Sequence, residues 1–150
     1  MKKVVLSIIV IVVSFLCVEC SFNSTYVDEA SEKIKAEKIT EKLYSYISKK
    51  DYKNAEKLFS ESFFKVTNRQ MLNDIFIKTN SDLGEYKTKK LIDWKTKRIV
   101  GNSPSSEYLL IYDVSYKSFK AKETINLLKE GQEIKIIGYN VNSEGFLSVK

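Results

Sequence analysis

The sequence predicts an α+β domain in which three N-terminal helices pack on a curled four-stranded antiparallel meander. Before Gly84, apolar residues recur at three- and four-residue spacing, which is typical of amphipathic helices. After Gly84, they recur at two-residue spacing, which is typical of strands with two different faces. No helical segment separates one expected strand from the next, so a parallel doubly wound sheet is not expected.

Residues 1–20 have the composition of a secretory signal peptide. Lys2 and Lys3 precede an apolar run, Val4 to Val18, that is shorter than the roughly 20 apolar residues of a membrane-spanning helix. An uncleaved N-terminal anchor is the alternative interpretation. We therefore expect an exported protein of the periplasm or cell envelope.

The end of this segment allows two forms of processing. Cys20 is either the lipid-carrying cysteine of a bacterial lipoprotein or, with Cys17, a small residue at an ordinary cleavage site. Residues 21–27 would form a polar tether, and residues 28–150 would form a single cone-shaped domain. Membrane contact is expected only through a lipid anchor or an uncleaved signal.

The first two helices follow from apolar spacing and from capping residues. Helix one is expected from about Asp28, as its N-cap, to the cations Lys49 and Lys50, which suit the negative end of a helix. Asp51 is expected to cap a second helix that runs from Tyr52 to about Ser60. The residues that share the core-facing side of helix one are Ala36, Ile39, Leu43, Tyr46 and Ile47.

The third helix has recognisable start and stop signals. Thr67, with Gln70 three residues later, has the spacing of a capping box. Gly84 is the expected C-terminal stop, because glycine adopts the left-handed conformation without a steric cost.

The four strands are expected at about 92–100, 108–117, 121–128 and 133–141. Ile92, Trp94, Arg98 and Val100 share one parity and should therefore face the same side of the sheet. Gly131 lies between the last two strands, where a tight hairpin needs a residue with positive φ.

Composition excludes several chemistries. The chain contains no His, which removes His-dependent triads and His-ligated metal sites. Both cysteines lie within residues 1–20, so the folded domain has no disulfide. Neither a glycine-rich phosphate loop nor an acid-rich calcium loop is present, and we expect no metal and no cofactor.

Charge patterning argues against a nucleic-acid partner. The formal net charge is +6. Lysines are spread over every segment and interleaved with acids, which is typical of a solvated surface rather than of a nucleic-acid-binding stripe.

Several segments carry a resemblance to the nuclear transport factor 2-like, or cystatin-like, superfamily. It covers roughly residues 30–147 and extends to small secreted or lipid-anchored bacterial families of unknown function. The carrying segments are 51–55, 58–59, 83–87, Trp94, 112–117, 121–124 and 128–139, the last ending in Lys135-Ile136-Ile137-Gly138-Tyr139. The resemblance implies a conical fold rather than a reaction, although some members are enzymes with a pocket between the helices and the curled sheet.

Within such a cone, Trp94, Arg98, Tyr112 and Tyr116 are the candidate ligand-binding residues. The alternative is that the aromatic members are core and cross-strand pairs, as strand aromatics commonly are. An enzyme of the isomerase or dehydratase type would need an acid–Tyr pair with a buried carboxyl group. Asp113 is expected at the surface, and no buried carboxylate is evident from the sequence.

The sequence therefore favours a non-enzymatic envelope domain that binds a small ligand, a peptide or an envelope protein. We expect no catalytic residue. An acid–Tyr enzyme and a structural or assembly component of the envelope are the alternatives, and the chain could also form a homodimer.

Overall fold

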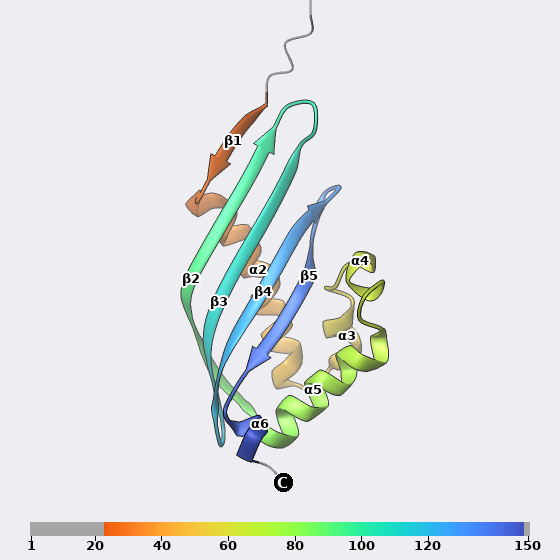
Figure 1. The fold of residues 1–150 in the computed structure, drawn as a ribbon, viewed down its shortest axis with the longest axis vertical. Helices are drawn as coiled ribbons and strands as arrows, with labels where there is room; N and C mark the ends of the chain where they lie inside the picture. Colours follow the sequence, from red (N-terminus) through yellow and green to blue (C-terminus); the bar gives the residue numbers. More distant parts are fainter. Residues whose placement is uncertain (1–22, 149–150) are drawn as a thin grey trace, which may run out of the picture.

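The computed structural model describes residues 23–148 and has one five-stranded antiparallel sheet with helices on one face (Figure 1). Its strands are β1 (Ser24–Val27), β2 (Tyr86–Val100), β3 (Ser105–Tyr116), β4 (Lys120–Glu130) and β5 (Glu133–Asn142). Each strand pairs with its neighbour in the sequence, so the sheet is a meander. The α+β class is confirmed, but the sheet has five strands rather than four.

The additional strand comes from residues that the sequence assigned to a polar tether. In β1, Ser24 pairs with Val100 and Val27 pairs with Lys97. Thr25, Tyr26 and Val27 are β-branched or aromatic residues, which favour strands wherever a partner strand is available. The signal peptide and Cys20 lie outside the described residues.

The helices are α2 (Ala30–Ser48), α3 (Tyr52–Glu56), α4 (Glu61–Phe64), α5 (Arg69–Leu83) and α6 (Gly145–Ser148). The expected second helix, 52–60, is therefore too long. Ser60 starts a separate helical turn instead, because its Oγ accepts a hydrogen bond from the Ser62 amide at 2.9 Å. No helix within residues 23–148 combines the length and the apolar character that a membrane span requires.

Two helix starts differ from the sequence prediction by one residue. Asp28 has a positive φ of 51°, and Glu29 occupies the N-cap position of α2. Asn68, rather than Thr67, caps α5, because its side chain accepts an amide hydrogen bond at 2.8 Å. Neighbouring polar residues can each supply a capping oxygen, so spacing alone does not choose between them.

Two glycine predictions are confirmed. Gly84 follows α5 with φ of 87°, and Gly131 lies in the β4–β5 turn with φ of 61°. A Cβ atom on Gly84 would also lie 2.9 Å from the Cβ of Lys117, so this position excludes a side chain on two grounds.

A β-bulge at Ile92 changes the parity of β2. Leu91 pairs with Tyr112, whereas Asp93 pairs with Ile111, so one extra residue is inserted between them. Ile92 is consequently 40% exposed, and its expected place beside Trp94 is wrong. Trp94 pairs with buried Leu110 but is itself only partly buried.

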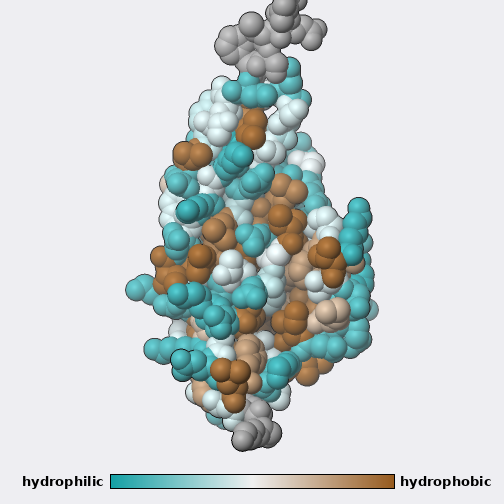
Figure 2. All heavy atoms as spheres, viewed as in Figure 1, coloured by the Kyte–Doolittle hydropathy of each residue, from teal (hydrophilic) through white to brown (hydrophobic). Residues whose placement is uncertain are grey.

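The core lies between α2, α5 and the inner face of the sheet. The two-residue spacing expected after Gly84 is confirmed in β3, whose buried residues are Tyr108, Leu110, Tyr112, Val114 and Tyr116. Figure 2, in the same view as Figure 1, shows the sheet face away from α2, where hydrophobic and hydrophilic side chains are interspersed. The large buried side chains of β3 therefore lie on the inner face of the sheet.

The free edge of β5 is partly covered by the connection between α3 and α4. Phe59 forms a parallel bridge with Ile136. The Ser60 amide donates to the Ile136 carbonyl at 2.9 Å, and the Ile136 amide donates to the Leu58 carbonyl at 2.9 Å. Main-chain groups at this point of the edge are therefore paired.

Candidate functional site

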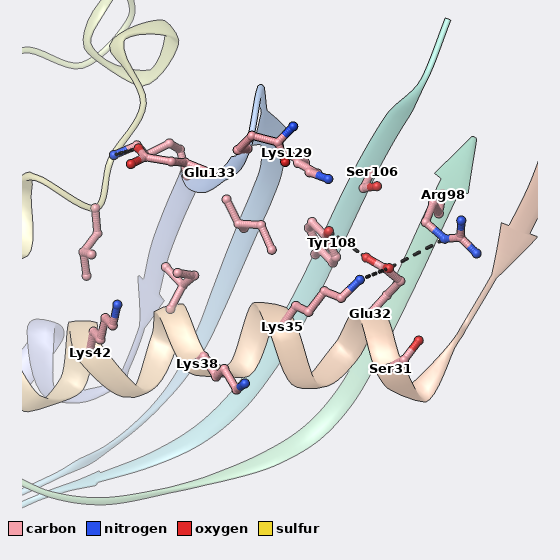
Figure 3. Close-up of a pocket in the computed structure, with 15 residues that line it drawn as sticks. Ser31, Glu32, Lys35, Lys38, Lys42, Arg98, Ser106, Tyr108, Lys129 and Glu133 are labelled. Atoms are coloured by element: carbon pink, nitrogen blue, oxygen red, sulfur yellow. Dashed lines mark hydrogen bonds and ion pairs between the residues drawn. The ribbon is translucent and has the colours of Figure 1, made fainter. Parts of the chain in front are cut away.

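An open groove of about 770 Å³ lies between α2 and the end of the sheet that carries the β4–β5 turn (Figure 3). We call it the basic groove. Helix α2 contributes Ser31, Glu32, Lys35, Lys38, Ile39 and Lys42. The remaining lining residues are Leu58, Arg98, Ser106, Tyr108, Lys129, Gln132, Glu133, Ile134 and Lys135.

Positive charge dominates the lining of the basic groove. Six lining side chains are cationic and two are carboxylates, which leaves a formal excess of four positive charges. The cations are Lys35, Lys38, Lys42, Arg98, Lys129 and Lys135. Cations gathered around a concave surface reinforce one another's potential and attract anions.

Three of these cations already form ion pairs, and the closest carboxylate to Arg98 is Glu29, at 2.9 Å and outside the lining. Glu32 lies 2.6 Å from the Lys35 ammonium group and 3.6 Å from the Arg98 guanidinium group. Lys135 lies 2.8 Å from Glu133. Within the described part of the chain, Lys38, Lys42 and Lys129 form no ion pair, so their charge is available to a ligand.

The two walls hold these three ammonium groups on different elements. Lys38 and Lys42 are one helical turn apart on α2, and in Figure 3 their side chains run in different directions from the helix. Lys129 comes from β4, next to the turn at Gly131. Because α2 and the β4–β5 hairpin are regular elements, the charges are held on rigid supports rather than on long loops.

Part of the lining of the basic groove is apolar, and we call this part its floor. Ile39 from α2, Leu58 from the α3–α4 connection and Ile134 from β5 line it, and all three are partly buried against the core. Their remaining exposed surface favours contact with apolar groups of a ligand. The groove therefore combines an apolar floor with cationic walls.

Glu32 lines the basic groove and is held in place by several partners. It is 4% exposed and accepts a hydrogen bond from the Tyr108 hydroxyl at 2.8 Å. Burial acts to raise the pKa of Glu32, but hydrogen bonds from Lys35 and Tyr108, with the charges of Lys35 and Arg98, lower the pKa below its ordinary value. Burial and the bond to Glu32 raise the pKa of Tyr108 to about 12. Glu32 is therefore an anion at neutral pH.

A second buried carboxyl group belongs to the sheet itself. Glu123 on β4 is 0% exposed. Its carboxyl oxygens accept hydrogen bonds from the hydroxyls of Tyr44 at 3.0 Å, Tyr116 at 2.5 Å and Tyr139 at 2.8 Å. These tyrosines belong to α2, β3 and β5, so the Glu123 cluster joins the helix to three strands.

Burial is the main cause of the pKa shifts in this cluster. It raises the pKa of Glu123, and the three tyrosine hydroxyls oppose that rise without cancelling it. Burial and the nearby carboxyl group also raise the pKa of Tyr116 and Tyr139 far above the ordinary range. Since Glu123 is fully buried, a substrate does not reach its carboxyl group in this structure.

The four sequence candidates occupy different environments. Arg98 lines the basic groove, where its Nε donates to Glu29 at 2.9 Å. Tyr112 and Tyr116 are buried, and the Tyr112 hydroxyl shares a 2.7 Å hydrogen bond with Thr40. Trp94 is partly buried, with the Lys33 ammonium group 5.7 Å from its ring centroid.

Sequence reasoning missed Glu123, although a signal was present. Ala121, Glu123 and Ile125 share one parity of the third expected strand, and the two apolar residues are buried. An acid flanked by apolar residues at i−2 and i+2 faces the core with them. The lysines of the basic groove carry no comparable local signal, because lysine occurs throughout the chain.

No family model, curated protein or solved structure matches the chain. Among residues 23–148, no group of three or more acidic, His or Cys side chains gathers as a metal site.

Proposed function

We propose that this protein is a non-enzymatic binding domain whose basic groove holds an anionic ligand. The observation that carries the proposal is the uncompensated charge of Lys38, Lys42 and Lys129 around one concave surface. A folded domain gains nothing in stability from like charges placed together. An anion that enters the groove neutralises them and gains from all three at once.

An acid–Tyr enzyme is the second candidate, and the Glu123 cluster favours it. A buried carboxyl group of raised pKa with a tyrosine hydroxyl 2.5 Å away has the groups that isomerase or dehydratase chemistry uses. The Glu123 carboxyl group is fully enclosed, whereas the basic groove is open. Turnover that Glu123→Gln abolishes would establish the enzyme.

We also propose that the protein is exported and that it belongs to the superfamily that its sequence resembles. Lys2, Lys3 and the apolar run to Val18 support export, with Cys20 as a lipid attachment point or as part of a cleavage site. The order of helices followed by a meander supports membership of the nuclear transport factor 2-like superfamily, with its conical enclosure. Cell fractionation and the intact mass of the mature protein test export, and a cytoplasmic product starting at Met1 would contradict it.

Binding of two simple polyanions, polyphosphate and polyglutamate, tests the groove directly. We expect both to bind, with affinity that falls as salt rises, because the attraction is electrostatic. Lys38→Glu with Lys42→Glu should weaken binding at least about tenfold, since two exposed ion pairs are replaced by repulsion. The measurement is fluorescence anisotropy of labelled ligand.

The matched control reverses two lysines on the other face of the sheet. Lys95 and Lys122 are exposed, and Lys95→Glu with Lys122→Glu changes the net charge by the same amount. Equal loss of binding in both double variants would show that only net charge matters. No binding to either polyanion would overturn the proposed function.

A further inference from the structure

The basic groove offers two kinds of contact in one place. Its floor is formed by the apolar side chains of Ile39, Leu58 and Ile134. Its cationic lining includes Lys38 and Lys42 from α2 and Lys129 from β4. A ligand that uses the whole groove must therefore carry apolar groups and anionic groups together.

The spacing of the wall charges adds a constraint on the ligand. Lys38 and Lys42 are four residues apart on α2, which corresponds to about 6 Å along the helix axis. In an extended peptide, side chains on one face recur every second residue, or about every 6.6 Å. Alternate acidic residues of such a peptide therefore match the repeat of the two lysines.

The alternation of side chains in an extended peptide also determines which contacts its apolar residues make in the groove. Side chains at odd and even positions of an extended chain point to opposite faces. Apolar residues on one face would rest on Ile39 and Ile134, while acidic residues on the other face would meet the lysines. The long lysine stems allow their ammonium groups to follow the upper face of the ligand.

We propose that the ligand is an extended acidic peptide segment in which apolar side chains alternate with carboxylates. This inference rests on the proposed anion-binding function of the groove and specifies the ligand class. A phosphate polymer would satisfy Lys38, Lys42 and Lys129 but would leave the apolar floor without a partner. The floor is therefore the feature that favours a peptide.

Three labelled probes of matched charge distinguish these classes. They are a peptide of alternating glutamate and leucine, a polyglutamate and a linear polyphosphate. We expect the alternating peptide to bind at least about tenfold more tightly than the other two, because burying even one apolar side chain corresponds to that factor. Its binding should also be retained better at high salt, since apolar contact is not screened.

Two variants separate the walls from the floor. Lys38→Glu with Lys42→Glu should weaken all three probes. Ile134→Ser should reduce the advantage of the alternating peptide over polyglutamate and leave polyphosphate binding unchanged, with the fold checked by circular dichroism. If Ile134→Ser does not fold, the salt series on the unmodified protein makes the same distinction.

The outcomes for the two proposals differ. Binding of polyglutamate and polyphosphate with no advantage for the alternating peptide would overturn the peptide inference and leave the anion-binding function standing. Preferred binding of polyphosphate would assign the groove to a phosphate polymer instead. Failure of all three probes to bind would overturn both proposals.

Discussion

Glu32 on α2 and Glu123 on β4 are two buried glutamates, and their environments shift their pKa values in opposite directions. Glu32 is 4% exposed and Glu123 is 0% exposed, and each accepts hydrogen bonds from tyrosine hydroxyls. The pKa of Glu32 is lowered, whereas burial raises the pKa of Glu123. Lys35 lies 2.6 Å from Glu32, while among residues 23–148 no cation forms an ion pair with Glu123.

The difference shows that burial and hydroxyl donors do not by themselves fix the charge of a carboxyl group. Tyr44, Tyr116 and Tyr139 give Glu123 three hydrogen bonds, yet these neutral donors do not offset its loss of hydration. Glu32 has two nearby cations and keeps its charge. Nearby cations therefore favour the charged form of Glu32, whereas burial without a cation disfavours the charged form of Glu123.

The largest expected effect comes from removing the enclosed carboxyl group. Glu123→Ala would leave three tyrosine hydroxyls without their acceptor and would open a cavity, at a cost of about 3–5 kcal/mol. Glu123→Gln retains an acceptor and should cost much less. Urea unfolding at neutral pH measures both. Equal costs in the two variants would show that the hydrogen bonds at Glu123 contribute little.

Removal of the charged glutamate should have a smaller effect. Glu32→Ala takes the acceptor from Tyr108 and one partner from Arg98, but Arg98 keeps its bond to Glu29 and remains partly exposed. We expect a cost of about 1–3 kcal/mol. The same urea unfolding assay applies, and a cost above that of Glu123→Ala would reverse the ranking of the two sites.

The contributions of Glu123 and Glu32 to stability should change with pH in opposite directions. The raised pKa of Glu123 means that its contribution to stability is present below the unfolded-state pKa, about 4.3, and is lost as pH rises through the folded-state pKa. The lowered pKa of Glu32 gives a contribution that is present above about 4.3 and is lost as pH falls through the folded-state pKa.

Thermal unfolding of the parent, Glu123→Gln and Glu32→Gln across this pH range makes the comparison. The stability advantage of the parent over Glu123→Gln should shrink as pH rises. Its advantage over Glu32→Gln should grow. Parallel curves for the two variants would contradict the difference between the two environments.

The smallest effect is expected at a buried bond that involves no carboxyl group. Thr40 and Tyr112 share a hydrogen bond of 2.7 Å within the core. Thr40→Val keeps the shape and removes the hydroxyl, at a cost of about 1 kcal/mol. Since neither group titrates near neutral pH, the cost measured by urea unfolding should be the same at pH 5 and pH 8. A cost that changes with pH would link this bond to the Glu123 cluster.

Regular patterns explain which parts of the fold could be predicted from the sequence. The β3 alternation and the glycines at 84 and 131 depend on local geometry that the residues carry with them. The bulge at Ile92 could not be predicted, because it depends on how β2 registers against β3. β1 was missed for a similar reason, since four residues become a strand only when β2 is beside them.

The candidate site was less predictable than the fold. Of the four expected cone residues, Arg98 lines the basic groove. Lys38 and Lys129 lie 91 positions apart in the sequence and meet only because α2 crosses the sheet near the β4–β5 turn. Glu123 could have been inferred from its parity, but its tyrosine partners come from three other elements.

The bridge between Phe59 and Ile136 also bears on how the chain avoids self-association. An uncovered outer strand is a template for another copy of the same protein, which can add a strand and continue into an aggregate. At β5 the α3–α4 connection occupies the main-chain amide and carbonyl of Ile136, which interrupts the row of groups that such a copy would need. At the opposite edge, the part of β2 beyond β1 carries exposed Lys87 and Lys90, whose charges repel an identical strand. Both features hinder the addition of a further strand, and neither of them covers the groove.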